Sequence, residues 1–401
     1  MKTKEVTDLY GKYVVPTYTQ SPLVLVRGKG LMVWDIEGKQ YLDFFPGWAV
    51  SGLGHCHPMV VNAVKDQCKR MIHISNNYYN HLQAKLAGVI SKSSFGGKVF
   101  FCNSGAEANE AAIKFARIYG GSGRFEIITM KNSFHGRTLA TVAATGQDKI
   151  KKGFDPLPEG FKHAPFNDFE AVKNAVTDKT TAIMLEPIQG EGGINIASKD
   201  YMFSLKQLCN EKNLLLIFDE VQTGMGRTGE MFCYQHYGVI PDIMTLAKSL
   251  GGGVPIGAMA VRADIAHTLK AGSHASTFGG SPLVCRAALA VFKAIEKDRL
   301  LNNVNLISKY LFDRLDNLRE KYGIIKEIRG LGLMIGVELR EECKPLAEEC
   351  VKRGLLINCT QGNVLRLMPP LIVSKKHVDK ALSILDKALE FLPKTSYKQE
   401  Q

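Results

Sequence analysis

Five short apolar runs joined by segments with helical periodicity constrain the fold of this chain more than any other feature. A strand that is apolar along its whole length is buried on both faces, and intervening helices suit crossovers between parallel strands. Right-handed crossovers then place helices on both sides of one sheet. The runs occupy residues 98–102, 125–130, 181–186, 214–219 and 243–247. The sequence therefore predicts an α/β fold built on a mainly parallel sheet.

The two ends of the chain follow other patterns. Near the N-terminus, short alternating segments separated by glycines are typical of small antiparallel strands. They lie at residues 23–27, 31–35 and 40–45. In the C-terminal part, long amphipathic helices alternate with apolar segments, which is an α+β pattern. The helices lie at residues 302–321 and 376–391, and the apolar segments at 331–339 and 364–367.

The length of the chain, 401 residues, is too great for one ordinary domain. We therefore predict an N-terminal segment at residues 1–60 that joins a small domain. A large domain at 61–295 follows, and then a smaller C-terminal α+β domain at 296–401.

Charge and cysteine content bear on partners and location. The formal charge of +12 is spread along the chain, and no basic run is interleaved with aromatic residues. This distribution argues against nucleic-acid binding and favours small anionic ligands. No apolar stretch is long enough to cross a bilayer, and the first residues lack the apolar core of a signal peptide. The 9 cysteines form no CxxC pair, which predicts reduced thiols. Together these features predict a cytoplasmic protein without membrane contact.

The segment at residues 98–110 predicts an anion cradle where a strand meets a helix. Ser104 is a good helix N-cap, and Glu107 has the spacing of a capping box. Gly105 lets the backbone approach a ligand, so that free N–H groups at the start of the helix and the helix dipole form an anion cradle. Phosphate is the natural guest, although a well-capped helix without a ligand would have the same residues.

Two charged side chains come at the carboxyl ends of other apolar runs, where ligands of open α/β sheets bind. Asp219 ends one run, and a buried carboxylate there needs a cation, either a protonated pyridine nitrogen or a nearby arginine or lysine. Lys248 follows another run and precedes three glycines. Partial burial would lower its pKa and free a neutral amine to attack a carbonyl, although a phosphate-binding loop would look similar.

Two further segments supply groups of the right kind. Phe134 can stack on a planar ligand, and Arg137 offers a planar fork for a carboxylate. Ser276 and Thr277 carry hydroxyls beside glycines, which suits phosphate contacts but also an ordinary turn.

Two motifs point to other kinds of protein. Residues 224–229 match the GxGxxG fingerprint of a dinucleotide site, which would make the chain an NAD-dependent oxidoreductase. No long amphipathic helix opens at Gly229, however, and Pro241 comes too soon for a βαβ unit. The triplet at residues 55–57 contains two histidines and a cysteine, but no second cluster matches it, so we expect a turn before Pro58 and no metal site.

Taken together, the motifs resemble the class III aminotransferases, which use pyridoxal 5'-phosphate (PLP). The similar segments keep their order and spacing over essentially the whole chain, and lie at residues 103–109, 134–138, 186–193, 219–229 and 247–248. The resemblance implies a PLP-dependent transferase of fold type I. Its large domain would hold a mainly parallel seven-stranded sheet, beside a smaller α+β domain.

The resemblance also implies roles at the cofactor. Lys248 would carry PLP as a Schiff base, and Asp219 would hold the pyridinium nitrogen. Gln222 would bond the phenolic oxygen, with Phe134 and Val221 on the two ring faces.

The phosphate would bind at the backbone N–H groups of Gly105 and Ala106, with Ser104 and His135 also in the cofactor site. Thr277, with Ser276, would reach the phosphate from the second subunit, so that a homodimer completes the site.

For the substrates, the resemblance implies that Arg137 binds the α-carboxylate. Glu191 would pair with Arg366 and release it when the second carboxylate of glutamate or 2-oxoglutarate arrives. Tyr18 and Trp48 would line the side-chain end of the pocket.

The resemblance implies transfer of the terminal amino group of N2-acetyl-L-ornithine to 2-oxoglutarate, by a ping-pong route in arginine biosynthesis. The products would be N-acetyl-L-glutamate 5-semialdehyde and L-glutamate. Ornithine, succinylornithine, succinyldiaminopimelate and 4-aminobutyrate remain alternative donors, and a catalytically idle PLP-binding protein is another reading. Gln20 and Ser281 depart from the family pattern, and Gln20 bears on side-chain recognition.

Overall fold

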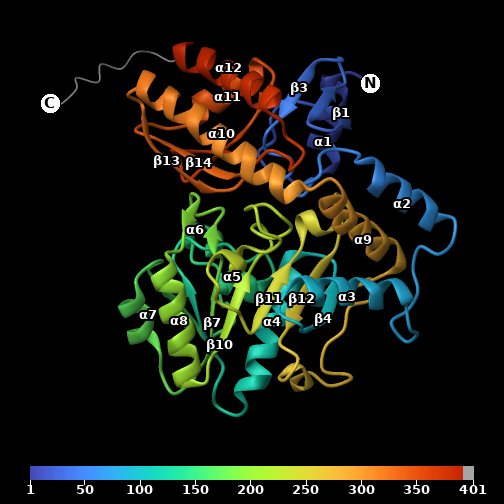
Figure 1. Cartoon of the computed structure of the whole chain (residues 1–401), viewed down its shortest axis with the longest axis vertical. Coiled ribbons are helices and arrows are strands. Elements are labelled where there is room, and N and C mark those ends of the chain that lie inside the picture. The colour runs from blue at the N-terminus through green and yellow to red at the C-terminus, as the bar shows by residue number, and fades with distance from the viewer. Residues whose placement is uncertain (392–401) are drawn as a thin grey trace.

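A seven-stranded sheet forms the centre of the computed structural model, which describes residues 1–391 (Figure 1). The strand order is β4-β12-β11-β10-β7-β5-β6. Within this sheet β12 runs antiparallel to β11 and β4, and the other strands share one direction. The strands are β4 (Lys98–Cys102), β5 (Glu126–Met130), β6 (Phe161–Ala164), β7 (Thr180–Leu185), β10 (Leu215–Asp219), β11 (Ile243–Leu246) and β12 (Gly257–Val261). The mainly parallel α/β sheet predicted from the sequence is confirmed.

Burial on both faces explains why the sheet strands are apolar throughout. In β10, Leu216 and Phe218 point into one hydrophobic cluster, whereas Leu215 and Ile217 point into another. Successive side chains of a strand alternate between faces, so both sets must be apolar when helices cover both faces. Helix α4 covers the second face, where Phe115 is fully buried.

Most helices of the large part lie around this sheet in the lower half of Figure 1, and α2 (Pro58–Cys68) lies higher, at the right. The others are α3 (His81–Ser93), α4 (Gly105–Gly120), α5 (Leu139–Ala144), α6 (Asp148–Lys151), α7 (Phe169–Ala175), α8 (Lys199–Lys212) and α9 (Pro282–Lys297). Short 3₁₀ turns lie at η1 (Cys233–His236), η2 (Lys248–Gly251) and η3 (Ala266–Thr268), and a small β8–β9 ribbon pairs Ile188–Gln189 with Asn195–Ile196.

All five apolar runs form strands, but β6 and β12 did not stand out in the sequence. Strand β12 follows a glycine-rich loop, and β6 contains Lys162 and His163. Because β6 is the edge strand beside β5, it tolerates polar side chains that a central strand would exclude. Periodicity alone therefore found five of the seven strands and missed β6 at one edge and β12 beside the other edge strand.

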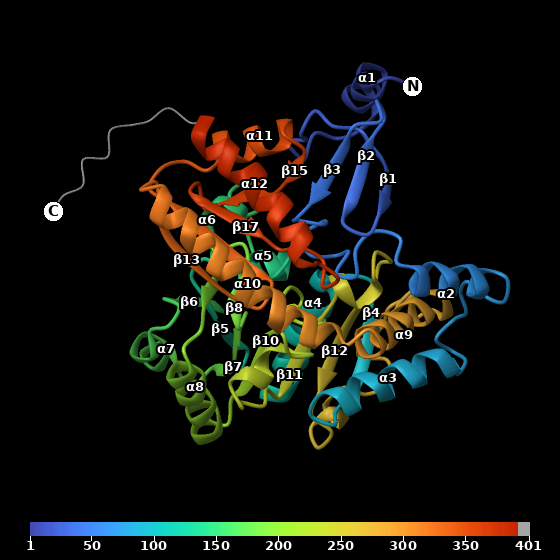
Figure 2. The same ribbon diagram turned by 45° about the horizontal axis from the view of Figure 1, so that its top comes forward.

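The two chain ends meet in the upper half of Figure 1. The N-terminal strand β3 pairs in parallel with β15, for example Leu42 with Leu355, and Figure 2 shows these strands side by side. The N-terminal elements are α1 (Thr3–Tyr13), β1 (Leu25–Lys29), β2 (Met32–Asp35) and β3 (Gln40–Asp43). The C-terminal elements are α10 (Leu300–Lys321), β13 (Ile325–Leu331), β14 (Met334–Leu339), α11 (Lys344–Lys352), β15 (Leu355–Leu356), β16 (Asn358–Thr360), β17 (Val364–Leu367) and α12 (Lys375–Phe391). The domain boundaries at residues 60 and 295 stay predictions.

A disulfide overturns part of the prediction that the cysteines are reduced. Cys343, which precedes α11, is bonded to Cys359 of β16, and the two Cα atoms are 5.9 Å apart. The sequence separation of 16 residues carries no disulfide signature, because the pairing depends on how β16 folds back beside the start of α11. The backbone N–H of Cys343 also donates to the carbonyl of Gly362, which keeps the two segments together.

No helix within residues 1–391 is long and apolar enough to cross a membrane.

We predict a pH effect on stability from His163 of strand β6. Burial, reinforced by the charge of Lys151, lowers the pKa of His163 to about 4. Between pH 6.5 and 4 the unfolded chain therefore binds a proton that the folded chain does not, so the free energy of unfolding falls as the pH drops through this window. In His163→Gln the melting temperature should depend less on pH between 4.5 and 7 than in the parent protein. Replacement of the exposed His267 by glutamine is the matched control and should keep the parent slope.

Candidate active site

A cavity of 440 Å³ lies where the parallel strands end. Residues that follow β4, β5, β10 and β11 line it, as expected for ligand sites of open α/β sheets. The lining residues are Val50, Asn103, Ser104, Gly105, Ala106, Asn109, Phe134, His135, Gly136, Arg137, Glu186, Glu191, Asp219, Val221, Gln222, Ala247, Lys248, Gly253, Val254, Pro255 and Ile256. The structure therefore brings together most of the site residues that the sequence predicted.

The N-terminus of helix α4 forms one wall of the cavity. The Ser104 side chain accepts the N–H of Glu107 at 3.1 Å, as predicted, but the Glu107 carboxylate turns back to Asn103 rather than to Ser104. Gly105 and Ala106 are the first residues of the helix, so no earlier turn supplies acceptors for their N–H groups. Together with the helix dipole they favour an anion.

Gly105 is required here by close packing. A Cβ atom at this position would lie 2.8 Å from Cγ1 of Val221, which no ordinary contact allows. The absence of that Cβ lets Val221 approach the helix N-terminus.

Asp219 ends β10 and is 4% exposed. Its Oδ2 accepts hydrogen bonds from Asn109 Nδ2 at 2.7 Å and from His135 Nδ1 at 2.8 Å, and its Oδ1 accepts the N–H of Val221 at 3.1 Å. Within residues 1–391 no lysine or arginine forms an ion pair with this carboxylate. A buried carboxylate held by fixed donors but lacking a permanent cation suits a cationic ring nitrogen in the cavity.

Lys248 also lines the cavity and lies at the start of the turn that follows β11. Its φ of 48° lies in the left-handed region that non-glycine residues seldom adopt, a conformation that costs about 1–3 kcal/mol. Burial lowers the pKa of Lys248, and the nearby carboxylates of Glu191 and Asp219 oppose that shift. Desolvation therefore favours the neutral amine that the sequence predicted.

Phe134 and Arg137 reach the cavity from the loop after β5. The guanidinium carbon of Arg137 lies 5.7 Å from the centre of the Phe134 ring. Arg137 is exposed, and among the described residues it has no carboxylate partner. It is therefore available to bind the carboxylate of a ligand.

Arg366 differs from Arg137 in being buried and fully partnered. Its side chain is 1% exposed, and Glu191 pairs with it at 2.6 and 3.1 Å. Glu191 lines the cavity whereas Arg366 does not, so the carboxylate covers the guanidinium. The ion pair implied by the sequence resemblance is present.

Four expected residues lie elsewhere in the single chain. Tyr18 is 72% exposed and Trp48 is 48% exposed, and neither lines the cavity. Ser276 accepts hydrogen bonds from Asn103 Nδ2 at 3.2 Å and from the N–H of Gly279, outside the cavity lining. Thr277 is exposed and also lies outside it.

Several lining residues were not singled out in the sequence, among them Asn109, Glu186 and Val50. Asn109 orients Asp219, and its own Oδ1 accepts from Thr245 Oγ1 at 2.7 Å. Burial raises the pKa of Glu186 to about 7, and this carboxylate accepts the N–H groups of Phe134 and Gly190. Asn109 could have been found from its position one helical turn after the anion cradle. No sequence signal identifies Val50, which enters from the N-terminal segment.

The two competing motifs have structural explanations. In residues 224–229 a Cβ on Gly229 would lie 2.1 Å from Asn305 Oδ1, and one on Gly226 would lie 3.0 Å from Leu301. These glycines therefore permit close packing on α10, and no long helix starts there to bind a pyrophosphate. In the triplet at residues 55–57, His55 bonds Asp43 at 2.7 Å, and the turn leads into α2 at Pro58.

The cavity has the groups needed for a flat, cationic, phosphorylated ring. Asp219 would meet the ring cation and the start of α4 would meet the phosphate, while Phe134 and Val221 border the cavity as apolar surfaces. Gln222 has a buried Oε1 without a hydrogen-bond partner among the described residues, which a ligand can satisfy. The residues present therefore fit PLP.

Comparisons with known proteins agree with this geometry. The family model described as "Aminotransferase class-III" matches residues 13–389. Proteins named acetylornithine aminotransferase from Methanocaldococcus jannaschii and Caldanaerobacter subterraneus subsp. tengcongensis are 55% and 54% identical, covering 96% and 94% of this chain and 98% and 97% of theirs. A solved structure of Toxoplasma gondii ornithine aminotransferase, described as having partial PLP occupancy at its active site, has a TM-score of 0.92 at 33% identity, with 97% of this chain and 94% of that chain covered. The chain belongs to the class III aminotransferases.

Proposed function

We propose that this protein transfers the terminal amino group of N2-acetyl-L-ornithine to 2-oxoglutarate. The products are N-acetyl-L-glutamate 5-semialdehyde and L-glutamate, and the reaction serves arginine biosynthesis. The observation that carries the proposal is a cavity with two unlike arginines, the open Arg137 and the covered Arg366, in a chain 54–55% identical to proteins named for this activity.

PLP is the cofactor, as in the family. When bound, it withdraws electrons from the substrate carbon that carries the amine. Gly105 and Ala106 would hold its phosphate through backbone N–H groups, with Ser104 shaping that helix start. Asp219, oriented by His135, would keep a proton on the ring nitrogen. Phe134, Val221 and Gln222 would fix the plane of the ring.

Lys248 is the group that moves the proton in this proposal. Its amine would bind the cofactor at rest and then take a proton from the substrate carbon. Desolvation lowers the pKa of Lys248 and so favours the neutral amine, which is the form that a general base requires.

The two arginines would divide the carboxylates between them. Arg137 would bind the α-carboxylate of every substrate, because its fork lines the cavity and has no carboxylate partner within residues 1–391. Acetylornithine has no second carboxylate, so Glu191 would stay on Arg366. Glutamate and 2-oxoglutarate would displace Glu191 and use Arg366.

We further propose that a homodimer in the cytoplasm is the working form. Thr277 is exposed beside Phe278, which is 63% exposed, and both lie outside the cavity of their own chain. Thr277 and Ser276 of one subunit would then reach the phosphate in the other. Tyr18 would join the side-chain end of the pocket.

We expect Arg137→Ala to lower kcat/KM for acetylornithine and for 2-oxoglutarate together. A charge-assisted hydrogen bond to a carboxylate is worth enough for a loss of roughly 10- to 100-fold. Arg137→Lys should lose less, because it keeps the charge without the planar fork. Arg319→Ala, on the exposed side of α10, is the control and should retain parent kinetics. A loss confined to one of the two substrates would contradict the shared role.

A panel of amino donors with 2-oxoglutarate tests the proposed function directly. The donors are acetylornithine, succinylornithine, ornithine, succinyldiaminopimelate and 4-aminobutyrate, and they are ranked by kcat/KM. We expect acetylornithine to rank first. Preference for 4-aminobutyrate or ornithine would overturn the proposed substrate.

A further inference from the structure

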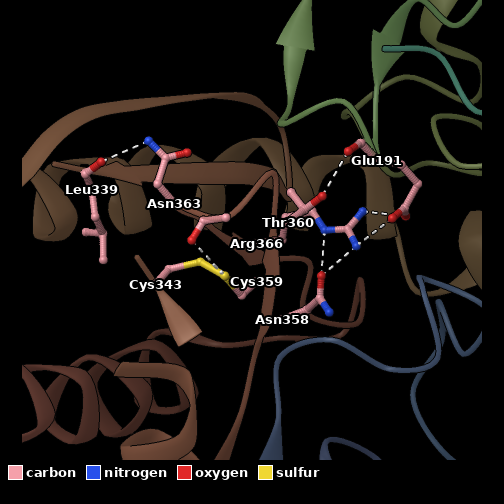
Figure 3. Close-up of a disulfide and its surroundings, with 9 residues drawn as sticks. Glu191, Leu339, Cys343, Asn358, Cys359, Thr360, Asn363 and Arg366 are labelled. Carbon is pink, nitrogen blue, oxygen red and sulfur yellow. Dashed lines mark hydrogen bonds and ion pairs between the residues drawn. A yellow bond between two sulfur atoms is a disulfide. The ribbon is translucent and has the colours of Figure 1, made fainter. Parts of the chain in front are cut away.

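Arg366 uses every hydrogen-bond donor that it has. A guanidinium carries five N–H groups. Nη1 donates to Glu191 Oε1 at 2.6 Å and to the carbonyl of Gly190 at 3.0 Å. Nη2 donates to Glu191 Oε2 at 3.1 Å and to Asn358 Oδ1 at 2.5 Å, and Nε donates to the same Asn358 oxygen at 2.9 Å. Figure 3 shows Glu191 and Asn358 on different sides of the guanidinium.

These partners fall into two sets. The Glu191 carboxylate accepts one N–H from each of the two terminal nitrogens, Nη1 and Nη2, which together form a fork. If its side chain leaves, the same two N–H groups are freed as a fork that matches an incoming carboxylate. The remaining three N–H groups stay bound to Asn358 Oδ1 and to the Gly190 carbonyl, so the guanidinium keeps its place.

After the Glu191 side chain leaves, Asn358 is the side chain that still holds Arg366, and its lack of charge matters as much as its position. An amide oxygen accepts hydrogen bonds without neutralising the cation, whereas a carboxylate there would compete with the substrate for the positive charge. Arg366 is 1% exposed, so water screens little of such an added charge.

The strand that carries Asn358 is itself fixed. Asn358 stands directly opposite Arg366 in the antiparallel pair of β16 and β17. The next residue, Cys359, forms the disulfide with Cys343, and Figure 3 shows that disulfide beside the ion pair.

The same strand also restrains the backbone of the glutamate. Thr360 Oγ1 and Gln361 Nε2 donate to the carbonyl of Glu191 at 2.8 and 2.7 Å. The backbone at Glu191 is thus held, and exchange with a substrate needs only rotation of its side chain.

We propose that Asn358 is a specificity-positioning residue: it is the neutral anchor that keeps Arg366 ready for the second carboxylate of the acceptor while Glu191 moves aside. The inference rests on the proposed function, because it takes Arg366 to be the site of that carboxylate. It predicts that Asn358 governs substrates with two carboxylates and leaves those with one unaffected.

The test compares two half-reactions of the holoenzyme, followed by the cofactor absorbance in single turnovers. Glutamate carries the second carboxylate, and acetylornithine does not. In Asn358→Asp the apparent affinity for glutamate should fall by roughly tenfold or more, while the affinity for acetylornithine changes less than about twofold. Inhibition by glutarate, which has two carboxylates and no reactive group, should weaken in parallel.

Two variants guard against a purely structural effect. Asn363→Asp makes the same change on the neighbouring β16–β17 turn, where the Asn363 side chain donates to Leu339 and lies away from Arg366 (Figure 3). It should leave the ratio of glutamate to acetylornithine affinity as in the parent. Asn358→Ala removes the anchor without adding charge and should also weaken glutamate selectively, which provides a second test if the aspartate variant folds poorly.

The outcomes separate the two proposals. If the parent enzyme follows the proposed donor ranking but Asn358→Asp and Asn358→Ala weaken both half-reactions equally, or neither, the role of Asn358 is wrong. If glutamate selectivity falls in the Asn358 variants while the parent prefers another donor, the role of Asn358 holds and the proposed donor is wrong.

Discussion

Replacement of Lys248 by alanine is expected to slow amino-group transfer by at least about 10³-fold, the largest effect predicted for this protein. A positioned general base contributes about 10²- to 10⁴-fold, and Lys248 would also be the covalent attachment of the cofactor. Its half-buried, strained position in the turn after β11 supports this double role. The rate is measured in single turnovers, together with the visible absorbance of the bound cofactor, which should shift in the variant.

Lys199→Ala is the matched control, because Lys199 is an exposed lysine at the start of α8. It should keep the parent rate and the parent spectrum. Retention of more than about a tenth of the parent rate by Lys248→Ala would remove this lysine from the catalytic step. The proposal for its proton transfer would then be untenable.

Replacement of Asp219 by asparagine is expected to reduce kcat by about 100- to 1,000-fold. This range is typical when a fixed electrostatic partner of the reacting group is removed. The asparagine keeps the size of the side chain but loses the charge that would hold a proton on the ring nitrogen. Because Asn109 and His135 both donate to Asp219 Oδ2, the new amide group also faces two donors, so cofactor affinity should fall as well.

Asp242→Asn provides the control for a buried carboxylate outside the cavity. Asp242 is 3% exposed, pairs with Lys206 and Arg262, and accepts the N–H of Leu216. Its replacement should lower the melting temperature while kcat of the folded enzyme is retained. If both variants lose kcat to the same degree, the effect of Asp219→Asn reflects general destabilisation instead of its place beside the cofactor.

Much of the site followed from the sequence because the groups stand at the ends of strands. Asp219 and Lys248 each end an apolar run, and parallel strands bring their carboxyl ends to one edge of the sheet. The N-cap residue Ser104 is a local signal for the start of helix α4, and Gly105 is the first residue of that helix. Local patterns of this kind depend on neighbouring residues only, so one sequence is sufficient to recognise them.

Other features needed the folded chain. The position of Tyr18 and Thr277 outside the cavity depends on which surfaces a single chain leaves open, and no local pattern encodes this. The disulfide of Cys343 and Cys359 contradicted an expectation based on spacing. It depends on the return of β16 toward the start of α11.

By itself, the sequence determined the α/β class, five of the seven sheet strands and many of the residues that line the cavity, since periodicity and strand-end position are properties of short segments. The resemblance implied that Arg366 pairs with Glu191, 175 residues away, but only the tertiary structure decided that Asn358, 8 residues away, holds the same guanidinium. The physical reason is that a hydrogen bond requires its atoms to lie about 3 Å apart at a suitable angle. The packing of whole elements sets such distances, and the order of residues along the chain does not reveal them.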